Sequence, residues 1–567
     1  MGSLALGTAL LIASGCYSTG EGPEPRANDL YFPVGILPSP GGHALYVANS
    51  DYDLKYNGGT IEVYNLDDIR DVALRPFWSP DPSDDTSDPC FGLGPNPNII
   101  LYPGPCGPLD LNRPPSRPVP YGPIFKRAAK IGAFATDVVM ACRPSDDIVF
   151  GGTADCMRGG MSAGESGARL FVPVRGDRSL TFLDVDDDRE GGVQTFKLEC
   201  GQGSNGGSCS DAYRAGIDPA DNTRGLTLPA EPFGVAISDR ADSLVLTHQS
   251  STYGAVSLFT NKVNGVNSVL DAKPRLEYVQ GDLPGSVTGI AALPTPAIDT
   301  FRGFAAANYQ PGFAITYRLR AQVDVVRFFD DTFGSPRRPY LQRTGAFTLT
   351  ATPNGSDSRD IVFETSTSSQ RVTCERACFV GGLDSCLSDC ALRPADERAR
   401  CEETCRTQGV DSCLMGCARI PIAAYVSNRS PASLLIGESR LPNGSGSNES
   451  IGFYDSVALS TGTSRVVIGR IHDRRDPPGV FRQRVFVVSF DSRTVAIYDP
   501  SERRVDGLVR TGRGPHAFVM DPVHPIAYIG HFTDSYIGLV DLDQSHALTY
   551  GSIVATIGIP TAPTGTK

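Results

Sequence analysis

The sequence predicts an all-β protein built from small repeated sheets, and three observations support this prediction. Of its 567 residues, 61 are glycine and 44 are proline, which long helices do not tolerate but many short strands need at their turns. Short stretches of alternating apolar and polar residues recur from residue 30 to the end, and turn residues close each of them. These stretches come in groups of three, and the groups repeat along the chain. A content of 40% hydrophobic and 20% charged residues is typical of a folded chain.

The chain begins with an apolar run that is typical of an export signal. Residues 4–14 are too few to span a bilayer and have the length of a signal-peptide core. The segment IASGC, which ends at Cys16, resembles a bacterial lipobox, in which the cysteine is acylated and becomes the first mature residue. The resemblance implies a signal peptide over 1–15, lipidation of Cys16 and a polar tether over 16–29. No Lys or Arg precedes the apolar run, which departs from the pattern. The alternative, an unprocessed N-terminal helix, lacks an amphipathic period.

The cysteine content also favours export. There are 15 cysteines, and setting Cys16 aside for the lipid leaves 14, an even number that is typical of a disulfide framework. Three local pairs are expected, although the sequence does not fix the connectivity: Cys90 with Cys106, Cys142 with Cys156, and Cys200 with Cys209. Under the lipobox resemblance, Tyr17 in place of aspartate implies an outer-membrane lipoprotein, which faces the periplasm or the cell surface.

Seven copies of a three-strand unit follow one another along the chain. The clearest copies are 32–36 with 44–49 and 59–66, then 232–237 with 243–248 and 254–259, and finally 514–519 with 526–531 and 536–541. Weaker copies centre on 170–184, 303–317, 423–436 and 485–499. Units of three or four short strands, repeated in a chain of this length, indicate the blades of a β-propeller.

The units resemble the YVTN-type β-propeller repeat, whose second strand ends in a Tyr-Val-x-Asn-like motif. Residues 46–49 (YVAN) and 425–428 (YVSN) match this motif, whereas 529–531 and 246–248 are degenerate. The resemblance covers most of residues 30–560 and implies a seven-bladed propeller. A pair of β-sandwiches or another multi-sheet fold is the alternative.

Seven blades of about 45 residues use only about 315 residues, so the remainder is expected in insertions. One insertion, 79–125, is rich in Pro and Asp and is expected to be held by a bond between Cys90 and Cys106. Another, 198–230, contains Cys200, Cys209 and many glycines. The third and most distinctive insertion is 371–420.

This third insertion contains an internal duplication. Residues 374–390 and 401–417 are identical at nine of seventeen positions, and each copy contains Cys-x₃-Cys twice. A spacing of i, i+4 places both sulfurs on one face of a helix, and the Gly-x-Asp-Ser piece between is expected to reverse the chain. The expected pairs therefore lie within each copy: Cys374–Cys390 and Cys378–Cys386, then Cys401–Cys417 and Cys405–Cys413. Two four-cysteine zinc sites are the alternative, which an oxidising environment disfavours. Such stapled hairpins would form a recognition knob or a protease-resistant decoration.

Several chemistries lack support in the sequence. The net charge of −12 argues against nucleic-acid binding, because phosphate contacts need clustered Lys and Arg. There is no His-Glu-x-x-His or Cys-x-x-Cys-His motif, and the glycines of 201–206 open no helix. The alternating Asp184, Asp186 and Asp188 lack the glycine and glutamate of an EF-hand, so a solvated turn is expected. No cofactor or metal is predicted.

Polar and aromatic residues follow the second strand of several units. In a propeller these strand ends and the loops after them gather around one face of the central channel, where rings and amides suit ligand binding. Tyr52 and Phe490 lie in such loops. The predicted binding rim comprises Asn49, Asp53, Tyr56, His248, Tyr253, Asn308, Tyr309, Asn428, Arg429, His531, Asp534 and Tyr536.

The sequence therefore predicts a non-enzymatic lipoprotein whose propeller binds a protein or glycan of the cell envelope through this rim and the hairpins. Because some propellers with the same repeat are lactonases or redox enzymes, the resemblance leaves an enzyme open. An enzyme of this kind would need His248, His531, Asp53 and Asp534 to converge on a metal or a substrate. A structural envelope protein without a ligand is the third hypothesis.

Overall fold

The computed structural model describes most of the chain. It comprises residues 20–71, 93–99, 103–111, 123–142, 168–189, 195–202, 207–238, 241–249, 253–261, 273–298, 310–329, 338–350, 356–364, 370–378, 384–405, 410–441, 449–473, 475–477 and 480–559. The predicted signal peptide, the lipidation site Cys16, and the cysteines Cys90 and Cys156 lie outside it.

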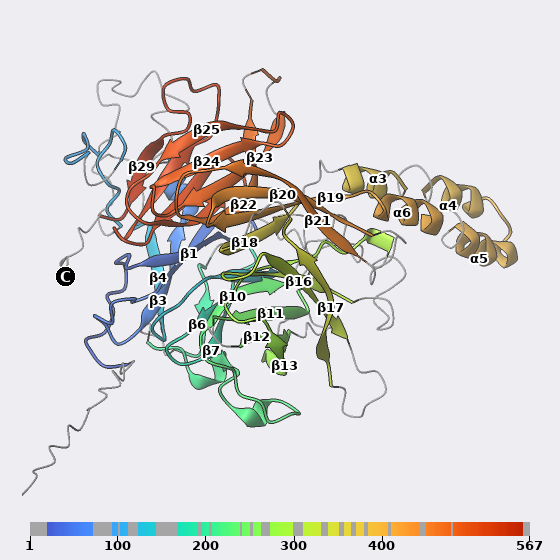
Figure 1. The fold of residues 1–567 in the computed structure, drawn as a ribbon, viewed down its shortest axis with the longest axis horizontal. Coiled ribbons are helices and arrows are strands. Elements are labelled where there is room, and N and C mark those ends of the chain that lie inside the picture. The colour runs from blue at the N-terminus through green and yellow to red at the C-terminus, as the bar shows by residue number, and fades with distance from the viewer. Residues whose placement is uncertain are drawn as a thin grey trace, which may run out of the picture.

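Seven antiparallel sheets form a ring, which confirms the predicted seven-bladed β-propeller (Figure 1). Blade 1 contains β1 (Pro33–Pro38), β2 (Ala44–Asn49), β3 (Gly59–Asn65) and β4 (Phe125–Ile131). Blade 2 contains β5 (Val139–Cys142), β6 (Ala168–Val174), β7 (Ser179–Val185) and β8 (Leu198–Glu199), with β9 (Arg214–Ala215) paired to β7. Blade 3 contains β10 (Pro232–Ile237), β11 (Ser243–His248), β12 (Gly254–Thr260) and β13 (Arg275–Leu283).

The other four blades repeat the same order of four consecutive strands. Blade 4 contains β14 (Val287–Ala292), β15 (Gly312–Tyr317), β16 (Gln322–Phe329) and β17 (Tyr340–Thr348). Blade 5 contains β18 (Ser358–Phe363), β19 (Ile422–Arg429), β20 (Ala432–Arg440) and β21 (Ser450–Ala458). Blade 6 contains β22 (Thr463–His472), β23 (Phe481–Ser489), β24 (Thr494–Asp499) and β25 (Arg504–Arg510). Blade 7 contains β26 (Pro515–Met520), β27 (Ile526–His531), β28 (Tyr536–Asp541) and β29 (Ile553–Ile557).

The hydrophobic core lies between neighbouring blades. On β2, Leu45 and Val47 pack against blade 7, whereas Tyr46 and Ala48 pack against blade 2. This division follows from the strand period of two, which sends successive side chains to opposite faces of a sheet. The middle strands are therefore apolar on both faces, as the burial of every residue of β2 shows.

The first and last blades meet without sharing a strand. Part of the predicted 79–125 insertion completes this seam, because the N–H of Leu109 donates to Thr556 O (2.8 Å) and the N–H of Gly558 donates to Leu109 O (3.0 Å). The buried guanidinium of Arg70 in blade 1 donates to Asp521 of blade 7 at 2.9 Å. Backbone pairing and a buried ion pair therefore add to the apolar core that blades 1 and 7 share at the seam.

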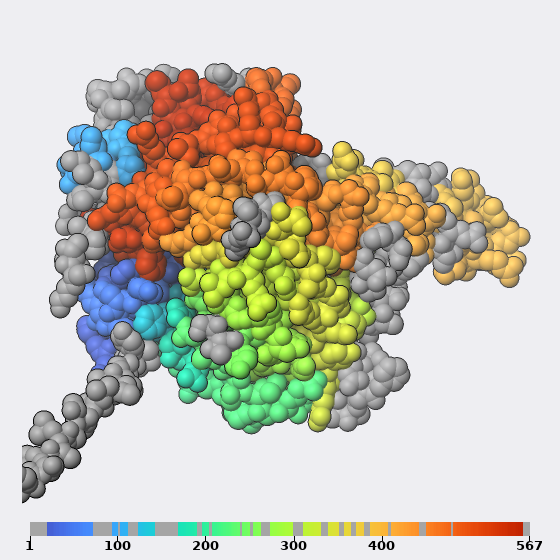
Figure 2. Space-filling view, in the orientation of Figure 1, coloured from blue at the N-terminus to red at the C-terminus, as the bar shows by residue number. Residues whose placement is uncertain are grey.

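A helical arm extends from blade 5, between β18 and β19, and projects away from the ring (Figures 1 and 2). It contains α3 (Gln370–Cys378), α4 (Asp384–Ala391), α5 (Ala395–Thr404) and α6 (Asp411–Ala418). The helices and their disulfides agree with the predicted insertion, but the predicted pairing within each copy is wrong. The disulfides are Cys374–Cys417, Cys378–Cys413, Cys386–Cys405 and Cys390–Cys401.

The two copies therefore face each other instead of folding back on themselves. Helix α3 is bonded to α6 at the base of the arm, and α4 is bonded to α5 at its far end (Figure 1). The chain reverses between α4 and α5, where the N–H of Arg393 donates to Cys390 O (3.0 Å) and Pro394 precedes the new helix. Proline has no N–H and disfavours helical geometry in the residue before it, so it ends α4 at this point. The sequence prediction assigned the reversal to Gly-x-Asp-Ser and overlooked this proline.

The base of the arm is fixed to the propeller body. Cys378, Leu414 and Cys417 are buried against residues 297–298. The carboxylate of Glu375 is also fully buried, accepts from the N–H of Ala297 (3.0 Å) and lies 3.3 Å from Arg371. The arm is thus joined to the ring by an apolar contact and by the hydrogen bond from Ala297 to the buried carboxylate of Glu375.

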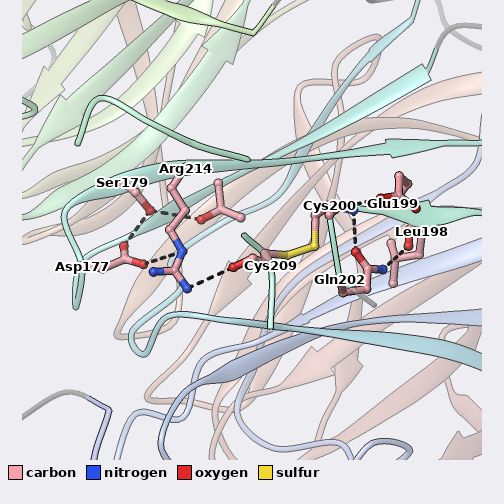
Figure 3. The surroundings of a disulfide bond; sticks show 10 residues. Asp177, Ser179, Leu198, Glu199, Cys200, Gln202, Cys209 and Arg214 are labelled. Carbon is pink, nitrogen blue, oxygen red and sulfur yellow. Dashed lines mark hydrogen bonds and ion pairs between the residues drawn. A yellow bond between two sulfur atoms is a disulfide. The ribbon is translucent and has the colours of Figure 1, made fainter. Parts of the chain in front are cut away.

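The predicted Cys200–Cys209 bond is confirmed. It lies beside blade 2, where Arg214 donates to the carbonyl of Cys209 (3.3 Å) and its Nε lies 3.7 Å from Asp177 (Figure 3). Cys106 is also disulfide-bonded, but its predicted partner Cys90 lies outside the described residues. Cys156, the predicted partner of Cys142, lies outside them as well. Among the described helices, none combines the length and hydrophobicity needed to cross a membrane.

Replacing Gly289 with alanine is expected to destabilise the protein by about 1–3 kcal/mol, because an added methyl group overpacks a filled interface. A Cβ at this position of β14 would lie 2.7 Å from both the carbonyl oxygen of Arg359 and the Cα of Asp360 in the next blade. Chemical denaturation measures the change. Gly281→Ala is the control, because nothing lies within 4 Å of its added Cβ. Equal losses in the two variants would contradict the tight approach of blades 4 and 5.

Candidate functional site

A channel runs through the centre of the ring, lined by the innermost segment of each blade. It contains a cavity of about 290 Å³. In six blades this strand has a register shift at its start, and a residue within or directly after the shift faces the channel. The seven residues that form this layer are Gly35, Asp137, Gly234, Gly289, Asp360, Arg465 and Ala517.

Three of the seven blades contribute a charge to the layer. The Nη2 of Arg465 in blade 6 lies 3.1 Å from Oδ1 of Asp137, which precedes β5 of blade 2. Blades 7 and 1 separate these two blades in the order of the ring, so the ion pair crosses the channel. Burial alone would lower the pKa of Arg465, but Asp137 and Asp360 raise it. The guanidinium therefore stays charged beside two carboxyl groups.

Asp360 is held by backbone donors on the wall of the channel. The N–H of Val466 donates to Oδ2 (3.1 Å), and the N–H of Ile361 donates to Oδ1 (3.0 Å). Burial raises the pKa of Asp360 to about 6, against the lowering influence of Arg465. The carboxyl group consequently titrates closer to neutrality than an ordinary aspartate.

His516 faces the same cavity from β26. Burial and the nearby Arg465 lower its pKa to about 3, so the imidazole is neutral at pH 7. No described residue forms a hydrogen bond with its ring, and its centroid lies 6.2 Å from that of Phe532. A neutral imidazole in this position can donate or accept one hydrogen bond to a ligand.

Aromatic rings gather at the strand ends of blades 6, 7, 1 and 2, where Phe532 approaches the channel residue His516. This mouth cluster comprises Tyr31, Phe32, Tyr52, Phe134, Phe490 and Phe532. Phe532 is its centre, with ring centroids 4.9 Å from Phe32 and 5.2 Å from Tyr52. Tyr52 remains 54% exposed, so the cluster presents an aromatic surface to solvent.

Two members of the mouth cluster have an unusual backbone conformation. Phe32 (φ 53°) and Phe134 (φ 60°) immediately precede the innermost segments of blades 1 and 2. Blades 6 and 7 have Gly462 and Gly514 at the equivalent point, also with positive φ. Bulky residues are rare in this region, and they persist at sites where the surrounding structure holds them. The same turn therefore carries a ring over the mouth in blades 1 and 2 and carries no side chain in blades 6 and 7.

Four residues of the predicted rim are buried within their own blades and have structural partners. Asn49 donates to Thr60 (3.0 Å), and His248 bonds Ser257 (2.7 Å) through Nε2. Asn428 accepts from Ser356 (2.7 Å), and His531 stacks on Tyr536 with centroids 4.0 Å apart. Burial lowers the pKa of His248 to about 4 and that of His531 to about 3. These four side chains fasten the strand ends to the adjoining loops.

The other rim residues are divided between interior and surface. Tyr56 and Tyr536 are buried, and the buried Asp534 pairs with Arg513 at 2.7 Å. On the surface, Arg429 pairs with Asp491 (2.7 Å), Asp53 accepts from the hydroxyl of Tyr31 (2.5 Å), and Tyr253 is 73% exposed. Asn308 and Tyr309 lie outside the described residues.

The constellation that an enzyme would need from the rim is not assembled. His248 belongs to blade 3 and His531 to blade 7, and each ring is buried between strands of its own blade. Neither histidine belongs to a group of His, Cys, Asp or Glu side chains close enough to hold a metal within the described chain. The alternating Asp184, Asp186 and Asp188 likewise bind separate partners, namely Arg169, Thr195 and Ser39.

The charged layer of the channel was not predicted from the sequence. Its signal was available in the innermost strands, where PVGI, PFGV and VTGI of blades 1, 3 and 4 become ATDV, SRDI and TSRV in blades 2, 5 and 6. Replacement of the recurring glycine by Asp137, Asp360 and Arg465 marks these blades as different. The prediction searched the strand ends instead, where polar residues occur in every blade.

A buried carboxyl group on β3 makes the stability of the fold depend on pH. Burial raises the pKa of Glu62 to about 8, although it accepts hydrogen bonds from Tyr64 and Thr60. Between pH 4.5 and 8 the folded state binds a proton that the unfolded state has lost, so the free energy of unfolding falls as pH rises. Glu62→Gln removes this contribution. In urea denaturation, the free energy of unfolding of the variant should therefore rise relative to that of the wild type by up to about 1.4 kcal/mol for each unit of increasing pH.

Glu397→Gln, which removes an exposed carboxylate from the arm, is the control for that experiment. A difference between wild type and Glu62→Gln that does not change with pH would contradict the burial of a protonated Glu62.

The ring and its charged channel define the chain as a seven-bladed β-propeller. No family model matches it, and no curated protein matches it. Among solved structures, hydrazine synthase of Kuenenia stuttgartiensis is 10% identical, with a TM-score of 0.40 over 90% of this chain and 96% of that chain. Sqt1 of Saccharomyces cerevisiae is 9% identical, with a TM-score of 0.39 over 97% and 94% of the two chains. A protein from Lactobacillus plantarum is 11% identical, with a TM-score of 0.35 over 70% and 84%. Likenesses of this degree carry no argument about function.

Proposed function

We propose that the chain is a non-enzymatic binding protein of the cell envelope, anchored by lipid on Cys16, which takes a protein or glycan partner at the channel mouth. The observation that carries this proposal is the mouth cluster above a channel lined with charged groups. Large rigid rings bring contact area at a low cost in conformational entropy, and recessed polar groups add specificity. The exposed ring of Tyr52 is the first contact that this arrangement offers.

The covalent structure supports the envelope location. Five disulfides join described cysteines. Disulfides in such number are typical of exported proteins, because thiols stay reduced in the cytosol. The lipid anchor and the outer membrane rest on the lipobox resemblance of residues 12–16, and mass spectrometry of the N-terminal peptide of the mature protein tests the lipid anchor.

One observation favours a second candidate, an enzyme that acts on a small substrate in the channel. Asp360 and His516 both line the cavity, and their pKa values are displaced in opposite directions, to about 6 and about 3. Displaced pKa values in a cavity are also found at catalytic sites. Chemical change in a bound ligand, lost in Asp360→Asn, would favour this candidate over the binding protein.

Crosslinking in intact cells followed by affinity purification tests the proposed function. The wild type is compared with Tyr52→Ala/Phe532→Ala, with deletion of 374–417, and with Tyr454→Ala, which removes an exposed tyrosine from the outer strand β21. We expect the double variant alone to lose its partner. Loss on deletion of the arm would move recognition to the hairpins, and equal capture by all four proteins would overturn the assignment to the mouth.

A further inference from the structure

We infer that the ligand of the channel is a neutral, hydroxyl-rich molecule, the neutral sugar units of a glycan. This inference rests on the proposed binding function and names the ligand's chemistry. It depends on three properties of the described channel: the charges of its lining cancel, its polar groups include both donors and acceptors, and its mouth is aromatic.

The charges in the lining sum to zero. Arg359 and Arg465 are positive, Asp137 and Asp360 are negative, and the imidazole of His516 is neutral at pH 7. Both cations already have an opposite partner, since Arg465 lies 3.1 Å from Asp137 and Arg359 donates to Asp357 at 2.8 Å, whereas Asp360 is held by backbone N–H donors. An anionic ligand would have to displace a carboxylate from one of these cations and leave it unpaired away from bulk water, which is costly. A neutral polar ligand can bind without breaking either pair.

The same groups can bond several hydroxyls at once. Carboxylates accept from hydroxyl groups, and a guanidinium offers five N–H donors, of which the pair with Asp137 occupies one nitrogen of Arg465. The ring of His516 adds a site without a hydrogen-bonding partner among the described residues. Adjacent hydroxyls of a sugar, each both donor and acceptor, match this mixture. A peptide side chain seldom presents such a row of hydroxyls.

The mouth cluster is suited to bind the apolar C–H face of a sugar ring. Aromatic rings present a negative face that attracts the partly positive C–H groups of a sugar ring. Phe532 lies beside both the channel histidine, at 6.2 Å, and the exposed Tyr52, at 5.2 Å. A glycan end could therefore place one unit in the channel and the next against these two rings.

The size of the cavity favours a glycan end over a protein partner. At about 290 Å³ it lies near the lower limit of about 300 Å³ for small-molecule sites. A stable protein partner contacts about 800 Å² of surface on each side, which requires a broad face rather than a recessed layer. The charged layer of the channel is therefore accessible to a narrow chain of sugars.

The test is binding of the full-length protein to an array of defined neutral hexose and N-acetylhexosamine oligosaccharides beside uronate and phosphate oligosaccharides. Calorimetric titration with the strongest oligosaccharide then compares the variants. We expect binding to neutral oligosaccharides only, with affinity reduced at least tenfold in Asp137→Asn and in Phe532→Ala and unchanged in Tyr454→Ala. Thermal melting shows whether each variant is folded. If Asp137→Asn does not fold, Phe532→Ala still tests the inference.

The outcomes separate this inference from the proposed function. Binding confined to uronate or phosphate oligosaccharides, or no array binding together with capture of a protein that needs Tyr52 and Phe532, would overturn the neutral sugar and leave the binding function in place. No array binding and no partner dependent on the mouth cluster would overturn both.

Discussion

Peptide mapping without reduction is expected to join the first helix of the arm to the last. A digest should link the peptide of Cys374 and Cys378 to that of Cys413 and Cys417, as the structure pairs them. Replacing Cys378 and Cys413 together with alanine should destabilise the arm by about 2–4 kcal/mol, because their bond is one of the two that join α3 to α6. Helices of 8 to 10 residues are marginal in water without such constraints. Loss of helical circular dichroism at lower denaturant concentration measures the effect.

The propeller provides an internal control for this experiment. Its strands do not depend on the disulfides of the arm. The near-ultraviolet circular dichroism of the ring should therefore be lost at the same denaturant concentration in the variant as in the wild type. Recovery of a peptide that links Cys374 to Cys390 would contradict the pairing between copies. Equal loss of arm and ring signals would contradict the independence of the two parts.

Replacing Arg465 with methionine is expected to destabilise the propeller by about 2–4 kcal/mol. The substitution leaves Asp137 and Asp360 without their common cation, and breaking a buried pair from one side costs more than the pair contributes. The side chain of Arg465 is 24% exposed to the channel, which keeps the expected loss below that of a dry interior pair. Urea denaturation at pH 7 measures it.

A double substitution separates charge from packing. Asp137→Asn in the Arg465→Met background should restore part of the lost stability, because it removes one uncompensated carboxylate. Arg440→Met is the matched control, since Arg440 is 58% exposed beside Glu438 and should cost less than about 1 kcal/mol. Loss of stability in the double variant equal to the sum of its single losses would mean that the ion pair contributes nothing across the channel.

The fold was predictable because its signal repeats. A strand pattern read seven times along the chain identifies blades even where a single copy, such as 485–499, is unremarkable. The pairing in the arm was not predictable from spacing, because Cys378 is compatible with Cys386 or with Cys413 by the same rule of inner with inner. Only the position of the chain reversal decides between them, and Pro394 sets it.

The candidate site was predictable in part. Tyr52 and Phe490 follow second strands, as the sequence analysis noted, and both belong to the mouth cluster. Phe32 and Phe134 precede innermost strands, and their approach to Tyr52 depends on a left-handed backbone that apolar periodicity does not reveal. Polar residues at the strand ends, such as Asn428, were predicted to form a binding surface. They instead form hydrogen bonds with buried residues of the adjoining loops.

The seam between blades 1 and 7 differs from the other contacts of the ring in one respect. Every other pair of neighbouring blades is joined by continuous chain, whereas these two are the first and last blades and meet through non-covalent contacts, including the backbone pairing of Leu109. Separating them splits no sheet, because each blade is complete within its own stretch of sequence. The ring is therefore closed at this seam by non-covalent contacts alone. Partial opening at the seam would widen the channel while all seven sheets stay intact.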